Sequence, residues 1–158
     1  MLNSPKIKRA FLDDLSKSGE KDVSLTIHLD NDQRILLNLS KNEADPRISG
    51  IAEAGQRGDP QTDGSSFFWP DGPCMSLEEI FDLLRKDSDG VITGVETYEG
   101  RSNEIDVMVA DGHMLMLSLD ELYVAAGQPR ASGAGISWPN GATLSFDDML
   151  AKLRSTPA

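Results

Sequence analysis

One segment of this sequence occurs twice, and the repetition restricts the possible folds more than any other feature. Residues 67–85, FFWPDGPCMSLEEIFDLLR, align without a gap on residues 136–154, ISWPNGATLSFDDMLAKLR, at an offset of 69 residues. Six of the nineteen positions are identical, whereas average residue frequencies give about one identity by chance. Such internal similarity predicts two copies of one structural unit.

A second pair of segments occurs in the same order. Residues 25–40, LTIHLDNDQRILLNLS, align on residues 105–120, IDVMVADGHMLMLSLD, at an offset of 80 residues. Both have apolar residues at every second position around a polar turn. The first copy is therefore longer, and the Gly-, Pro- and Asp-rich residues 55–66 predict a loop there. We interpret the pattern as a duplication; the alternative is that ordinary hairpins and helices fall in the same order by chance.

In the second copy, alternating apolar residues predict half-buried strands. We expect a strand over residues 91–100, then two strands joined by a tight turn at Asp111-Gly112, where both residues take positive φ. The return strand, residues 113–119, is apolar on both faces, so it is expected at the centre of a sheet or covered on both sides. A short helix over 118–129 and a short strand over 135–141 follow. Ser145 caps a closing helix, whose apolar stripe is Phe146, Met149, Leu150 and Leu153.

The first copy predicts the same series, with a hairpin over residues 25–39, a short helix over 45–54 and a short strand over 67–69. Ser76 and Glu79 have the spacing of a capping box. They precede a closing helix with the apolar stripe Leu77, Ile80, Phe81 and Leu84. Residues 5–12 are ambiguous, because local propensity favours a helix and the repeat favours a strand. We predict a strand.

These elements predict an α+β fold made of two small units, residues 1–86 and 87–158. Each unit is expected to be an antiparallel β-meander with a short helix, a short strand and a closing helix. The two units form separate domains or pack as one two-lobed domain.

The formal net charge is −11, and it is unevenly distributed. Residues 48–150 carry five Lys and Arg against eighteen Asp and Glu. This charge disfavours direct nucleic-acid binding, which needs clustered basic residues, and it favours a basic protein partner. The alternative is that the acidity serves only solubility.

From the sequence we expect no membrane span, no secretory signal and no cofactor. No apolar run approaches the roughly 18 residues of a membrane span, and the first residues do not resemble a secretory signal. The single cysteine, Cys74, allows no internal disulfide, so we expect a cytoplasmic protein. His28 and His113 are isolated from further Cys or His ligands. No nucleophile elbow, phosphate-binding glycine loop or dinucleotide fingerprint occurs, so neither a metal, a cofactor nor catalysis is expected.

Five residues are candidates for a protein interface. Trp69 and Trp138 are either interface anchors or plugs between sheet and helix. The acidic residues of the first closing helix offer a surface that mimics phosphates, or they stabilise the positive end of that helix. These acidic candidates are Glu78, Glu79 and Asp82.

Three methionines extend this set of candidates. Met108, Met114 and Met116 lie on the opposite face of the second hairpin from its main apolar residues. They form either an adaptable binding surface or a contact with the other copy.

The segments DGHMLMLSLDEL and ISWPNGATLSFDDML of the second copy resemble a small bacterial family, the domain-of-unknown-function family 2442. NDQRILLNLS and FFWPDGPCMSLEEIF of the first copy match its pattern more loosely. The resemblance covers about two thirds of the chain and implies tandem, degenerate copies of that unit. It also implies a protein-binding role, because some members look like antitoxin partners of small toxins.

We therefore predict a non-enzymatic, acidic protein-binding module, such as an antitoxin-like or immunity-like protein or a phage-type inhibitor of a basic partner. One alternative is a small-ligand-binding or enzymatic role in the cleft between the two copies. Another is a structural protein that associates with itself. The sequence identifies neither the partner nor the oligomeric state.

Overall fold

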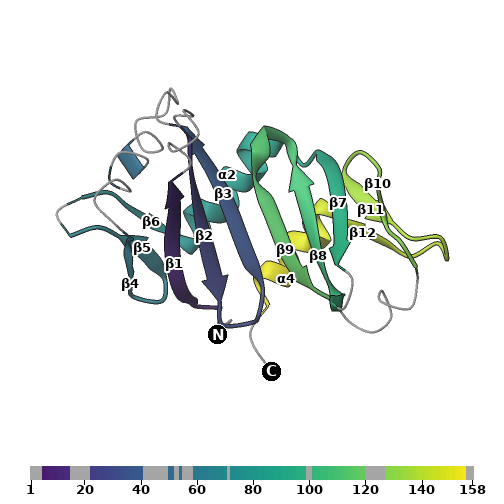
Figure 1. Cartoon of the computed structure of the whole chain (residues 1–158), viewed down its shortest axis with the longest axis horizontal. Helices are drawn as coiled ribbons and strands as arrows, with labels where there is room; N and C mark the ends of the chain where they lie inside the picture. Colours follow the sequence, from purple (N-terminus) through teal and green to yellow (C-terminus); the bar gives the residue numbers. More distant parts are fainter. Residues whose placement is uncertain are drawn as a thin grey trace.

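A computed structural model describes residues 5–14, 22–40, 50–51, 54, 59–70, 72–98, 101–119 and 127–155. Its centre is one antiparallel six-stranded sheet (Figure 1). The strands lie in the order β1-β2-β3-β9-β8-β7, so each half of the chain contributes a three-stranded meander and β3 meets β9 in the middle. Their bounds are β1 (Ile7–Asp14), β2 (Asp22–Leu29), β3 (Arg34–Ser40), β7 (Ile92–Tyr98), β8 (Arg101–Val109) and β9 (Met114–Ser118).

A small three-stranded sheet lies at each end of the large one (Figure 1). The Ile7 N–H donates to the Gly64 carbonyl over 2.7 Å at one end, and the Ile92 N–H donates to the Gly133 carbonyl over 2.7 Å at the other. The prediction of one short strand per unit was incomplete, because strands of two or three residues are too short to show alternation. These strands are β4 (Gln61–Thr62), β5 (Ser66–Phe68), β6 (Cys74–Ser76), β10 (Arg130–Ala131), β11 (Gly135–Ser137) and β12 (Thr143–Ser145).

Two closing helices, α2 (Leu77–Ser88) and α4 (Phe146–Leu153), pack on one face of the large sheet, behind it in Figure 1. Both begin with the predicted side-chain cap. The Glu79 N–H donates to Oγ of Ser76 over 3.1 Å, and the Ser76 N–H donates to the Glu79 carboxylate over 3.2 Å. Ser145 and Asp148 repeat this pair of bonds at 3.1 and 3.0 Å. Both predicted apolar stripes are buried: Leu77, Ile80, Phe81, Leu84, Phe146, Met149, Leu150 and Leu153.

The halves meet through a short ladder between β3 and β9, in which Arg34 pairs with Met116, Ile35 with Leu115, and Leu36 with Met114. Ile35 and Leu115 are also equivalent at the offset of 80 residues, so the ladder is arranged about a local two-fold axis through that pair. β9 is central, as its two apolar faces predict. The unit border predicted at residue 86 falls inside α2.

The turn at Asp111-Gly112 differs from the prediction. It is a three-residue loop, η3 (Ala110–Gly112), closed by the Val109 N–H donating to the His113 carbonyl over 3.0 Å. Only Gly112 in it has positive φ, at 88°, because a three-residue hairpin needs the left-handed conformation at its last position alone. Asp32 has the same role in the first hairpin, with φ 69°.

Residues 7–14 form a strand, β1, which confirms the prediction made from the repeat against that from local propensity. The two predicted short helices lie largely outside the described residues. Of residues 45–54, positions 50, 51 and 54 are helical, and Ile51 and Ala54 are buried. Residues 120–126 of the second predicted helix are outside the description, and Ser118 ends β9.

Candidate functional site

No described helix or strand covers the face of the large sheet opposite α2 and α4 (Figure 1). We call it the open face. Strand alternation places the fully buried residues, such as Leu25 and Leu115, toward the helices. Their neighbours along each strand point to the open face and are half-buried in most positions.

One set of cross-strand partners on the open face is free of charge, and we call it the apolar row. It runs through consecutive register partners on all six strands, so its side chains lie next to one another. Its members are Phe11, Thr26, Leu36, Met114, Met108 and Gly94.

The neighbouring set of partners carries most of the charges of this face, and we call it the charged row. It is basic on the strands of the first half and acidic on those of the second half. In order across the sheet, its members are Arg9, His28, Arg34, Met116, Asp106 and Glu96.

The two rows are related by the local two-fold axis. His28 and Met108 are equivalent at the offset of 80 residues, as are Arg34 and Met114. Each pair stands directly across one hairpin, His28 opposite Arg34 and Met108 opposite Met114. Equivalent backbone positions therefore carry His28 and Arg34 in the first half, which we call the basic end of the open face. In the second half they carry Met108 and Met114, which we call its methionine end.

At the basic end, residues of both halves line a pocket of about 370 Å³. Lys8, His28 and Arg34 come from the first half, and Glu104 and Ser118 come from the second. Arg34 and Glu104 form an ion pair over 3.8 Å with both side chains about one-third exposed. Partial burial, followed by the positive charges of Arg34, Arg9 and Lys8, lowers the pKa of His28. Asp32 lines this pocket as well, so the pocket holds two carboxylates, Asp32 and Glu104, beside the two cations Lys8 and Arg34.

Two buried polar residues, Gln33 and His113, bind the halves together. Gln33 did not stand out in the sequence, and His113 was considered there only as a metal ligand. The Ser118 N–H donates to Oε1 of Gln33 over 2.7 Å, and the Asn38 N–H donates to Nδ1 of His113 over 3.0 Å. Gln33 also donates from Nε2 to the Ser118 carbonyl over 3.3 Å. Gln33 and His113 are equivalent, as are Asn38 and Ser118, so these contacts extend the β3–β9 ladder symmetrically at both ends.

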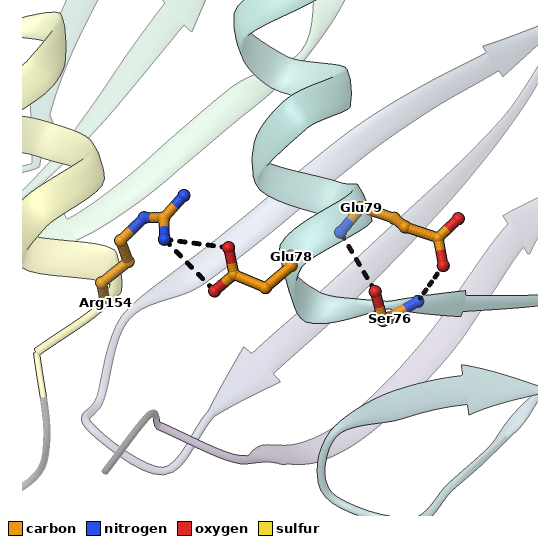
Figure 2. Close-up of polar contacts among 4 residues, drawn as sticks. All are labelled: Ser76, Glu78, Glu79 and Arg154. Atoms are coloured by element: carbon orange, nitrogen blue, oxygen red, sulfur yellow. Dashed lines mark hydrogen bonds and ion pairs between the residues drawn. The ribbon is translucent and has the colours of Figure 1, made fainter. Parts of the chain in front are cut away.

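Two of the three predicted acidic residues take part in contacts within the chain (Figure 2). Glu78 accepts from Arg154 at the end of α4 over 2.9 and 3.2 Å. Glu79 completes the cap of α2, while Asp82 is exposed on that helix. The equivalent ion pair joins Arg85 to Asp147, so two related pairs connect the helices.

Trp69 and Trp138 are buried, with 6 and 5% of their surface exposed. Trp69 makes an edge-to-face contact with Phe67 at 5.9 Å between ring centroids. Trp138 borders a pocket of about 290 Å³ beside Arg130 and Gln128. Both indoles lie where the chain reverses after the short strands β5 and β11.

Met108, Met114 and Met116 lie on the open face, on the strands where the sequence places them. Met114 and Met116 pair with Leu36 and Arg34 of the first half. They thus contact the other half along the sheet, and they also form part of the uncovered surface.

Within the described part of the chain, no group of three or more His, Cys, Asp or Glu side chains is placed to hold a metal ion. No helix among these residues is long and apolar enough to cross a membrane. Comparison with family models, curated proteins and solved structures finds no match. The resemblance to family 2442 therefore stays a prediction.

Proposed function

We propose that the chain is a non-enzymatic protein-binding module that holds a basic protein on the open face, over the methionine end of the apolar row and the acidic end of the charged row. The observation that carries this proposal is the apolar row, in which Phe11, Leu36, Met114 and Met108 present half-buried apolar side chains on the uncovered face. Contiguous apolar surface of this kind marks interaction sites. Methionine suits such a surface because its flexible, polarisable side chain adapts to a partner.

The charge of the chain supports a basic partner. Glu96 presents an exposed carboxylate on the edge strand β7, next to the buried Asp106. The net charge of −11 attracts a basic protein over a longer range. The family resemblance supports an antitoxin-like, immunity-like or phage-type inhibitor acting in the cytoplasm.

The open face fits this role better than the acidic residues of α2 do. Glu78 is bound to Arg154, and Glu79 caps its own helix (Figure 2). A partner that binds Glu78 has to compete with its internal ion pair. The exposed carboxylate of Asp82 remains for a partner on that side of the molecule.

We also propose that the two halves arose by duplication of one unit. The Ile35–Leu115 pair and the reciprocal ion pairs of the helices support this origin. So does the order of elements, because three strands, three short strands and a helix occur twice.

Affinity capture from cell lysate tests the function through matched variants. Met114→Asp places a charge in the apolar row and is expected to reduce partner recovery at least about tenfold, because a charge buried without a partner costs several kcal/mol. Ala151→Asp makes the same kind of change on the exposed side of α4 and is expected to leave recovery unchanged. Recovery by the wild type is expected to fall as salt rises.

Three outcomes contradict the proposal. They are capture of no stoichiometric partner by the wild type, undiminished capture by Met114→Asp, and capture that Asp82→Asn reduces but Met114→Asp does not. The last outcome places the partner on α2.

A further inference from the structure

We infer that the basic end of the open face, around Lys8, His28 and Arg34, binds the phosphoryl group of a small phosphorylated molecule. This site is separate from the methionine end to which the protein partner is assigned. The inference rests on the arrangement of the charges, on the pocket between them and on a comparison of the two halves.

The basic side chains converge although the chain is strongly acidic. Arg9, His28 and Arg34 are direct cross-strand partners on three adjacent strands, and Lys8 lines the same pocket. Arg34 shares an ion pair with Glu104, and a bound anion has to compete with that carboxylate. Lys8 brings a second positive charge to the pocket, and Lys and Arg are the usual ligands of phosphate oxygens.

The fold does not require this set of charges. Met108 and Met114 occupy the positions equivalent to His28 and Arg34, and the sheet there has the same register. Thr93 occupies the position equivalent to Lys8. Each follows an isoleucine, Ile92 or Ile7, whose N–H donates to a glycine carbonyl of the adjacent small sheet. The same architecture thus forms with uncharged side chains in all three positions, so the basic set points to a ligand.

The pocket has the size and lining for more than a bare ion. Its volume of about 370 Å³ lies within the range of small-molecule sites. The phosphoryl group fits beside Lys8, His28 and Arg34. Asn103, Ser118, Glu104 and Asp32 also line the pocket and offer hydrogen-bond donors and acceptors to hydroxyl groups. A hydroxylated phosphate monoester, such as a sugar phosphate, matches this lining.

Calorimetric titration of the whole protein at low salt tests the site with three probes, namely ribose 5-phosphate, inorganic phosphate and ribose. Ribose 5-phosphate is expected to bind most tightly, inorganic phosphate more weakly, and ribose not measurably. Arg34→Met and Lys8→Thr install the residues of the other half, so they are expected to fold. Each is expected to weaken ribose 5-phosphate binding at least about tenfold, through loss of a charge-assisted hydrogen bond.

Lys86→Met removes an exposed positive charge on α2 and is expected to leave the affinity unchanged. The inference is overturned if the wild type does not bind ribose 5-phosphate, if Arg34→Met binds it as well as the wild type, or if ribose binds equally well. A single-stranded oligonucleotide that binds these side chains more tightly than ribose 5-phosphate also overturns it, in favour of a nucleic-acid ligand.

Discussion

Gln33 follows the first hairpin turn and is 6% exposed. Its amide satisfies both the N–H and the carbonyl of Ser118 in the other half. A side chain thereby continues a backbone ladder that covers only three residue pairs. Gln33 and His113 thus add side-chain hydrogen bonds between the halves to the backbone ladder of their strands.

Gln33→Met keeps the approximate volume of this side chain and removes its hydrogen bonds. We expect the variant to lose about 1–3 kcal/mol of unfolding free energy, because the part-buried backbone groups of Ser118 lose their partner. Gln61→Met is the same change at an exposed residue of β4, and its expected effect is within about 0.5 kcal/mol. Urea denaturation measures the unfolding free energy of both variants. Equal losses in Gln33→Met and Gln61→Met would show that the hydrogen bonds of Gln33 contribute nothing to stability.

At the scale of elements, α2 and α4 are connected by two equivalent ion pairs, Glu78 with Arg154 and Arg85 with Asp147. Arg154 also lies 4.5 Å from the ring centroid of Phe81. Because all four charged side chains are at least 44% exposed, solvent screens each pair, and its contribution to stability is small.

A double-mutant cycle of Glu78→Gln and Arg154→Gln is expected to give a coupling energy of about 0.2–1 kcal/mol that decreases in high salt. The equivalent cycle on Arg85 and Asp147 is expected to agree with it. Glu96, on the open face of the edge strand β7, and Arg154, at the end of α4, supply a control pair with an expected coupling near zero. If the coupling energy of the control pair equals those of the two ion pairs, the ion pairs do not stabilise the contact between α2 and α4.

The closing helices were predictable because two independent signals agreed in each, a Ser cap and an apolar stripe of period 3.6. The small sheets were not predictable, since two-residue strands such as β4 and β10 carry no periodicity. The turn at Gly112 was predicted at the right residue but with the wrong length. The dipeptide Asp-Gly does not by itself distinguish a two-residue from a three-residue loop.

For the whole molecule, strand alternation predicted that Met108 and Met114 share a face. It did not predict that Leu36 and Phe11 extend this face, because their placement depends on the long-range pairing of β3 with β9. The basic end was missed for the same reason, as Lys8, Arg34 and Glu104 are distant in sequence. The sequence thus predicted most elements and their faces, while the sheet order that creates the candidate site came from the structure.

Methyl NMR of the methionines tests the open face as the protein-binding surface most directly. Met108, Met114 and Met116 lie on that face, while Met75 and Met149 are completely buried and serve as internal controls. On titration with the basic protein recovered by capture, the methyl signals of the three open-face methionines are expected to shift. Those of Met75 and Met149 are expected to stay in place. Binding that leaves the open-face methyl signals unmoved and shifts backbone signals of α2 and α4 would contradict the account.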